Sequence, residues 1–140
     1  MFDHKQTLGH LTAQLARIAA GRLRDALAPL GLLPAQFTAL AEIAMAEGMT
    51  QKQLVERLDL EQPGVARTLA GLERLGWIER HALAGRSHGL WLTERAREVL
   101  PAALAAAETV DSRLTASLTT TECAQLLDQL LQLVEEQPRG

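Results

Sequence analysis

The chain has 140 residues, enough for one domain and too few for two complete ones. Its 27 leucines and 23 alanines are strong helix formers, so we expect a mainly α-helical protein. The net charge of −3 argues against a general nucleic-acid coat protein, and no apolar run reaches the roughly 18 residues that cross a bilayer. The N-terminus lacks the pattern of a signal peptide, so we expect a cytoplasmic protein without a membrane partner.

Residues 5–28 are predicted to form a long helix that Pro29 and Gly31 end. Its apolar positions follow helical spacing at Leu8, Leu11, Leu15, Ile18, Leu23 and Leu27. This stripe is too narrow to form a core alone, so it must pack on another helix, in this chain or a partner. Pro34 opens a second helix to about Glu47, which we expect to support the segment that follows.

Residues 50–76 have the pattern of a helix-turn-helix. Thr50 and Gln53 have the spacing of a capping box, and Pro63 suits the first turn of a second helix. The predicted buried stripe of that second helix is Val65, Leu69, Leu72 and Leu75. The residues left to face outward are Gln62, Gly64, Arg67, Thr68, Gly71 and Arg74. Such a small, polar and basic face predicts a helix that reads DNA.

After Gly76, residues 77–81 and 90–92 have the aromatic and apolar content of two strands. The connection over residues 82–89 has a polar, basic tip containing Arg86, Ser87 and His88. An ordinary surface hairpin would fit the same residues. Its position directly after the second helix favours the wing of a winged helix, with these three residues as candidate DNA contacts.

The C-terminal third predicts two more helices. Thr93 can cap a helix that runs to Leu114, with a kink or break expected near Pro101. Thr119 and Glu122 form a capping box for a final helix with a wide apolar face. Residues 5–28 and 94–137 are therefore predicted to form a homodimer. A two-fold dimer presents two reading helices to half-sites about 34 Å apart.

Charge is distributed unevenly along the chain. Residues 50–97 carry a net charge of +2 and the remainder carries −5. The positive charge therefore gathers, modestly, in the segment expected to meet DNA.

Three stretches together resemble the MarR family of winged helix-turn-helix transcription regulators. They are Leu33-Pro34-Ala35-Gln36-Phe37, the run from Thr50 to Leu58, and Gln62 to Arg80 followed by Leu92-Thr93-Glu94. The resemblance implies one domain over residues 1–140, with residues 33–93 as the DNA-binding region. It also implies an obligate dimer, a pseudo-palindromic operator on double-stranded DNA, and usually repression relieved by a small ligand or an oxidant.

By position, the resemblance puts the family's recognition-helix arginine at Arg67 and its wing-tip arginine at Arg86. Arg67 is expected to contact phosphate or a base edge in the major groove, and Arg86 to enter the minor groove. Two departures bear on specificity. Gly64 stands where the family usually has Ser or Thr, and residues 82–85 lack the wing's usual Asp.

Thr50 and Gln51 could meet phosphate through the N-terminus of their helix, although capping alone explains them equally well. His10 and Arg17, one helical repeat apart, could bind the carboxylate of a small ligand, or could simply be exposed polar residues. Cys123 is more consistent with a structural or exposed thiol than with a redox sensor, because it has no basic neighbour in sequence.

Other function classes find less support in the residues. The four histidines show no metal-ligand spacing, so no metal or cofactor is expected, although a site assembled from distant residues stays open. No catalytic motif is present, and we do not expect an enzyme. A winged-helix dimer that binds proteins instead of DNA is the alternative from another class, and a thiol- or metal-responsive regulator is a variant of the first reading.

Overall fold

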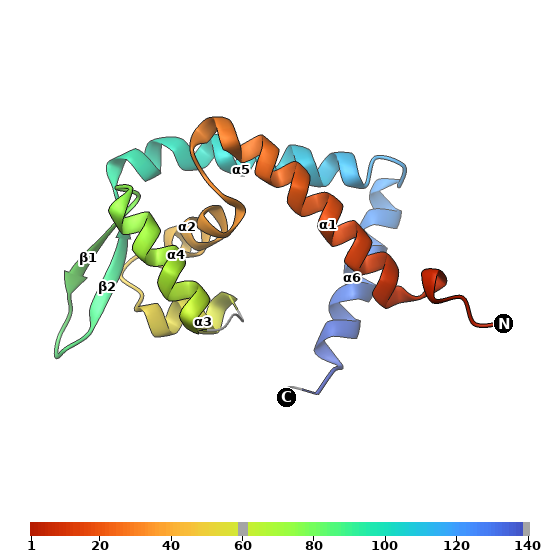
Figure 1. Cartoon of the computed structure of the whole chain (residues 1–140), viewed down its shortest axis with the longest axis horizontal. Coiled ribbons are helices and arrows are strands. Elements are labelled where there is room, and N and C mark those ends of the chain that lie inside the picture. Colours follow the sequence, from red (N-terminus) through yellow and green to blue (C-terminus); the bar gives the residue numbers. More distant parts are fainter. Residues whose placement is uncertain (59–61, 139–140) are drawn as a thin grey trace.

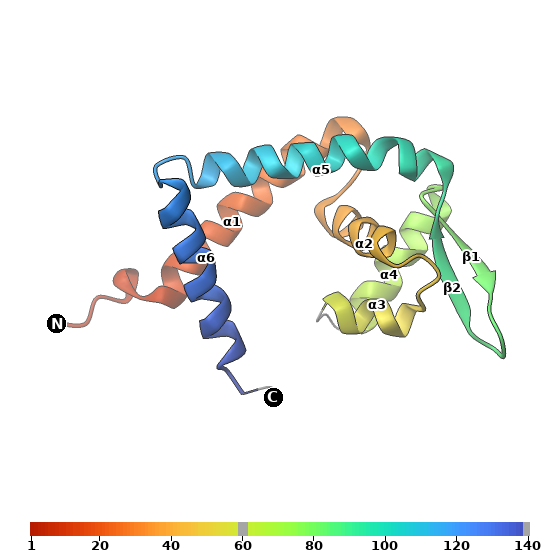
Figure 2. The ribbon, with the colours of Figure 1, turned by 180° about the vertical axis from the view of Figure 1, so that it is seen from behind.

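A computed structural model describes residues 1–58 and 62–138 of the chain, apart from the side chains of Gln62 and Pro63. One long helix, α5 (Glu94–Leu114), forms the backbone of the architecture. The helix-turn-helix and a β-hairpin lie beneath its N-terminal end, and α6 (Thr120–Glu135) descends from its C-terminal end (Figure 1). The view from behind shows α1 (Leu8–Leu27) packed along α5, with its N-terminal half extending away toward α6 (Figure 2).

The N-terminal helix begins later than the sequence predicted. A short 3-10 helix, η1 (His4–Gln6), comes first, and α1 then starts at Leu8 because the Thr7 hydroxyl accepts a hydrogen bond from the His10 N–H at 3.2 Å. At its other end α1 runs into η2 (Ala28–Leu30) and stops at Gly31, which has a φ of 76°. The positive φ turns the chain into α2 (Pro34–Met45), as the Pro-Leu-Gly sequence suggested.

The helix-turn-helix consists of α3 (Gln51–Leu58) and α4 (Gln62–Arg74). The predicted capping box is confirmed: the Thr50 N–H donates to Gln53 Oε1 at 2.9 Å, and the Gln53 N–H donates to the Thr50 hydroxyl at 3.2 Å. Gly76, with a φ of 78°, follows α4 as predicted. The predicted turn at residues 59–61 lies outside the described residues.

The hairpin is present, but β1 is shifted by one residue from the predicted 77–81, and β2 begins two residues before the predicted 90–92. β1 (Ile78–Ala82) pairs antiparallel with β2 (His88–Leu92), in a register that sets Ile78 opposite Leu92 and Ala82 opposite His88. Residues 82, 88 and 89 therefore belong to the strands and not to the loop. The loop is closed by the Leu83 N–H, which donates to the Ser87 carbonyl at 2.9 Å.

The core lies where α2, α4, the hairpin and the first half of α5 meet. Phe37, Leu40 and Ile43 of α2 are buried in it, as their spacing predicted. Of the predicted stripe on α4, Val65, Leu69 and Leu72 are buried, but Leu75 is 45% exposed. Leu75 follows the last residue of α4 and precedes the positive-φ Gly76, so it leaves the helical periodicity. Trp77, at 1% exposure, occupies the core in its place.

The expected break at Pro101 is not found, because α5 is continuous from Glu94 to Leu114. Pro101 is exposed, while Leu100 and Ala103 beside it are buried, so the helix is packed against the core on both sides of the proline. The predicted caps at Thr93 and at Thr119 with Glu122 are confirmed. Among the described residues no single helix could cross a membrane, and only α1 and α2 taken together, across a 76° bend, have the required length and composition.

Candidate nucleic-acid interface

The outer face of α4 carries the polar residues that the sequence singled out. Gly64, Arg67 and Arg74 are exposed, and Thr68 is half-buried. A Cβ atom at Gly64 would meet nothing within 4 Å, so a Ser or Thr would fit there without a clash. Gln62 begins α4, and its side chain lies outside the described part of the structure.

The side chains at the start of α3 make more contacts within the protein than the sequence suggested. The Thr50 hydroxyl serves as an N-cap, and Gln51 Oε1 lies 3.4 Å from Arg80 Nη1 of β1. Arg80 Nε in turn donates to Glu73 Oε2 of α4 at 2.7 Å. Arg80 therefore ties α3, α4 and β1 together, while the Thr50 N–H and hydroxyl are both engaged by Gln53.

The tip of the wing is the third part of this surface. Arg86 and Ser87 are exposed in the loop after Gly85, which has a φ of 80°. His88 is also exposed but is the first residue of β2. The wing tip and the start of α4 lie on the same side of the molecule, away from α5 (Figure 1). The start of α4 and the tip of the wing, which carry most of the predicted contacts, are thus on one side of the molecule (Figure 1).

Six arginines in and beside the winged helix differ in whether a carboxylate binds them. Arg57, Arg80 and Arg97 form ion pairs with Glu42, Glu73 and Glu47 at 2.9, 2.7 and 2.7 Å. Within residues 1–58 and 62–138, no ion pair involves the exposed Arg67, Arg74 or Arg86. Their positive charge remains available to an anionic partner such as a phosphate backbone.

The base of the wing is held by contacts that the sequence analysis missed. Glu47 Oε1 accepts a hydrogen bond from the Leu92 N–H at 2.9 Å, and Arg97 Nη2 donates to the Leu92 carbonyl at 3.1 Å. The two side chains also bind each other through two hydrogen bonds, of 2.7 and 2.8 Å. The hydrogen bond from Arg97 lowers the pKa of the Glu47 carboxyl and raises the pKa of the guanidinium.

Arg95 was also missed, and it secures the end of α4. Its Nη1 donates to the Leu75 carbonyl at 2.7 Å, and its guanidinium carbon lies 3.9 Å from the centre of the buried Trp77 ring. A cation at the C-terminus of a helix is attracted to the negative end of the helix dipole, and this attraction stabilises the helix. The first turn of α5 thereby reaches both α4, through Arg95, and the wing, through Arg97.

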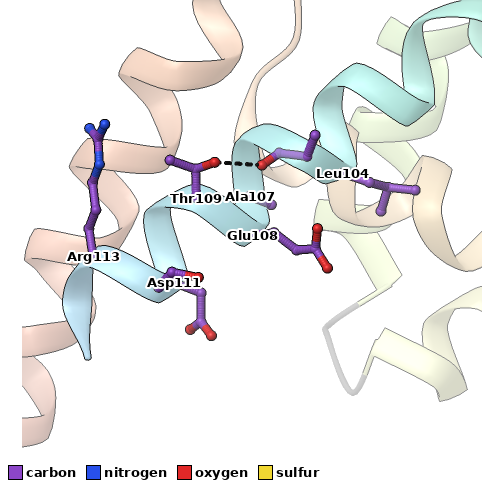
Figure 3. Close-up of a pocket in the computed structure, with 8 residues that line it drawn as sticks. Leu104, Ala107, Glu108, Thr109, Asp111 and Arg113 are labelled. Carbon is purple, nitrogen blue, oxygen red and sulfur yellow. Dashed lines mark hydrogen bonds between the residues drawn. The ribbon is translucent and has the colours of Figure 1, made fainter. Parts of the chain in front are cut away.

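The remaining candidates lie away from this surface. A groove of about 970 Å³ runs along α5, where Leu104, Glu108 and Asp111 line it (Figure 3). Neither His10 nor Arg17 lines that groove: His10 is half-buried with its ring edge-on to His4, and Arg17 is exposed. The structure does not bring the two together with a cavity.

Cys123 and the histidines gain no further partners. The thiol of Cys123 is free and half-buried, beside Thr119 and Leu127 in a shallow groove that no basic residue lines. His81 of the wing lies against Trp91, and its Nε2 is 3.0 Å from Glu79 Oε2. Over the described residues, no group of three or more His, Cys, Asp or Glu side chains could hold a metal ion.

A helix-turn-helix followed by a hairpin whose base packs on it defines the winged helix-turn-helix class. Residues 30–87 match the model of the MarR family. The fold over nearly the whole chain is that of solved MarR structures.

Two of the similar structures come from Escherichia coli and Pseudomonas aeruginosa. A mutant MarR from E. coli complexed with operator DNA has a TM-score of 0.86, with 25% identity over 94% of this chain and 99% of that one. A probable transcriptional regulator from P. aeruginosa has a TM-score of 0.87, with 25% identity over 94% and 99% of the two chains.

Two further relatives complete the comparison. A MarR family protein from Mycobacterium tuberculosis, in complex with salicylic acid, has a TM-score of 0.73 and 26% identity over 93% of this chain and 98% of that one. An uncharacterized HTH-type transcriptional regulator from Bacillus subtilis, YwoH, is 37% identical over 71 residues. That match covers 51% of this chain and 52% of YwoH, so this chain spans about half the length of that relative.

Proposed function

We propose that this protein is a dimeric, sequence-specific DNA-binding transcription regulator. The observation that carries the proposal is the exposed outer face of α4, where Arg67 and Arg74 form no ion pair with a described residue while Arg57 and Arg80 of the same region are bound to carboxylates. In this proposal α4 enters the major groove with Arg67, Thr68, Gly64 and Gln62, and Arg86 of the wing enters the minor groove. The N-terminus of α3, capped by Thr50 and beginning at Gln51, meets phosphate, and Ser87 and His88 flank the wing contact. The likeness to a MarR bound to operator DNA supports the assignment.

We propose that residues 33–93 form the DNA-binding region and that residues 5–28 and 94–137 form a homodimer. Apolar side chains on the terminal helices are left in water by the single chain: Leu8, Leu11, Leu15 and Ile18 on α1 are 42–57% exposed, and Leu126, Leu127, Leu131 and Val134 on α6 are 37–70% exposed. A contiguous exposed apolar face of this kind indicates an interaction surface. A symmetric dimer would bury both faces and place two copies of α4 on a pseudo-palindromic operator.

We further propose that the protein is a repressor that a small ligand releases from DNA. The support is the salicylic acid complex of the M. tuberculosis relative. Salicylic acid is therefore the probe to titrate into a complex of this protein with DNA. Release of the duplex would support the proposal, and an unchanged affinity at saturating salicylic acid would remove its present basis.

DNA binding is tested by selection from random duplexes, followed by an Arg67→Ala variant. We expect a palindrome to be enriched at moderate salt, and Arg67→Ala to bind it at least about tenfold more weakly, the loss expected for a base-contacting arginine. The variant should keep its thermal stability because Arg67 is exposed. Arg24→Ala, an exposed arginine on α1, is the matched control and should bind normally.

Two results would count against the proposal. Unchanged affinity of Arg67→Ala would show that α4 is not the reading helix. Failure to enrich any palindrome would favour the alternative, a winged-helix dimer that binds another protein.

A further inference from the structure

In the hairpin of the wing, the edge of β2 that faces away from β1 helps to set the position of the wing. β1 pairs with only one edge of β2, so the outward N–H and C=O groups of β2 need other partners. At Leu90 these partners are backbone groups: the Leu90 N–H donates to the Met49 carbonyl, and the Gly48 N–H donates to the Leu90 carbonyl, both at 2.8 Å. The connection between α2 and α3 thus acts as a short third strand.

At Leu92, two residues further along the same edge, side chains take over this role. The carboxylate of Glu47 accepts from the Leu92 N–H, where a neighbouring strand would offer a carbonyl. The guanidinium of Arg97 donates to the Leu92 carbonyl, where a strand would offer an N–H. The two side chains are joined by their own hydrogen bonds, so the substitute for a strand is continuous.

The position of the wing tip depends on this edge. Arg86 lies six residues from Leu92, which at about 3.4 Å per residue puts the tip roughly 20 Å from the base. A tilt of about 10° at the base would therefore move the tip by roughly 3 Å, which is as long as a hydrogen bond. The anchoring residues come from the connection that follows α2 and from the first turn of α5, and both helices contact β2.

We propose that Glu47 and Arg97 are positioning residues that together replace a strand at the outer edge of β2 and so set the angle of the wing toward DNA. The second part of this proposal, the angle of the wing toward DNA, rests on the proposed function. The replacement of a strand can be tested without DNA.

The first experiment measures amide hydrogen exchange in the full-length protein. In Glu47→Ala we expect the Leu92 amide to exchange at least about tenfold faster, because it loses its acceptor, while the Leu90 amide keeps its bond to Met49 and its rate. Glu42→Ala breaks the ion pair of similar length with Arg57 and is the matched control, in which both rates should stay unchanged. An unchanged Leu92 rate in Glu47→Ala, or equal acceleration of Leu90 and Leu92, would overturn the proposal.

The second experiment uses the palindrome enriched by selection, in two backgrounds. We expect Glu47→Ala and Arg97→Ala each to weaken binding about tenfold in the wild-type background, and to add little in an Arg86→Ala background. General destabilisation would instead weaken binding equally in both backgrounds, and that result would overturn the role in wing placement. If no duplex is enriched, the proposed function fails, and hydrogen exchange still decides whether the edge is held as proposed.

The third experiment reverses the pair with Glu47→Arg and Arg97→Glu in one protein. The ion pair can form again, but the Leu92 N–H then faces a donor and the Leu92 carbonyl faces a carboxylate. We expect the reversed pair to leave Leu92 exchange fast and DNA binding weak. Recovery of both to wild-type values would show that only the attraction between charges matters, and would refute the replacement of a strand.

Discussion

At the scale of the residue, some arginines of the winged helix join its elements and others are exposed on its surface. Arg80 and Arg97 each contact two different elements besides their own, through a carboxylate and one further group. Arg67 and Arg86 extend from the same part of the chain into open solvent. The fork of the guanidinium suits both tasks because its donors lie in one plane and can bind a carboxylate, a carbonyl or a phosphate.

Gly89 is a second residue whose identity the fold requires. A Cβ atom there would lie 2.5 Å from Trp91 Cζ3 and 2.8 Å from the Gly48 carbonyl oxygen, closer than side chains approach one another. Trp91 cannot move aside freely, because its ring also contacts His81. Gly89 has a hydrogen atom where alanine would have a methyl group, and this lets the wing pack closely on the connection between α2 and α3.

We therefore expect Gly89→Ala to lower the free energy of unfolding by about 1–3 kcal/mol, the usual cost of overpacking. Urea titration measures the change. Gly64→Ala is the control because a Cβ atom there meets open space, and it should raise stability by up to about 1 kcal/mol through helix propensity. Equal stability of Gly89→Ala and wild type would mean that the wing opens to admit the methyl group.

At the scale of the element, local patterns were predictable and long-range partners were not. The capping boxes at Thr50 and Thr119 follow from residues three apart, and both are present. The anchor between Glu47 and Arg97 joins residues fifty apart, so only the folded chain reveals it. For the same reason the DNA-binding candidates could be named from the sequence, while the residues that hold them in place could not.

Two of the predictions that the structure contradicts have the same origin. The assignment of Leu75 to the core extends a period past the end of its helix, and the expectation of a break at Pro101 ignores the burial of Leu100 and Ala103. Local rules failed in both places because tertiary packing decided the outcome.

The anchor of the wing should also give the protein a characteristic sensitivity to acid. The pKa of the Glu47 carboxyl is lowered from 4.5 in the folded state, mainly by its hydrogen bond to Arg97. Its stabilising effect is therefore complete above the unfolded value, and is lost as the pH falls through the folded one. We expect wild type to exceed Glu47→Gln in unfolding free energy by a constant margin between pH 7 and 5.

That margin should shrink as the pH falls below 4.5, because protonation makes the wild-type side chain neutral too. Urea titrations of both proteins at a series of pH values measure it. A margin that stays constant down to pH 3 would mean that the charge of Glu47 contributes nothing to the anchor.

At the scale of the whole molecule, the distribution of exposed apolar residues is the main clue to assembly. α6 makes no extensive contact with the other described elements, and four of its five leucines are exposed. A charge placed in this face should prevent association without disturbing the winged helix, whose core includes none of these side chains.

We expect Leu131→Asp to be monomeric at concentrations where the wild type is a dimer, and to bind the selected palindrome much more weakly because one reading helix is lost. Sedimentation velocity gives the assembly state. Met45→Asp is the control, since Met45 is 74% exposed but lies on α2, and it should remain a dimer. A wild type that sediments as a monomer at every concentration would exclude the proposed homodimer.

Because α5 is continuous past Pro101, a change in its length also rotates its two ends relative to each other. Its 21 residues form a single rod about 30 Å long, from the base of the wing to the turn before α6. Deleting one residue from the rod would shorten it by about 1.5 Å but would twist one end against the other by about 100°. α5 therefore fixes the rotation of its two ends relative to each other far more strictly than the distance between them. Insertions and deletions in its middle should be tolerated best in steps of seven residues, which nearly complete two turns.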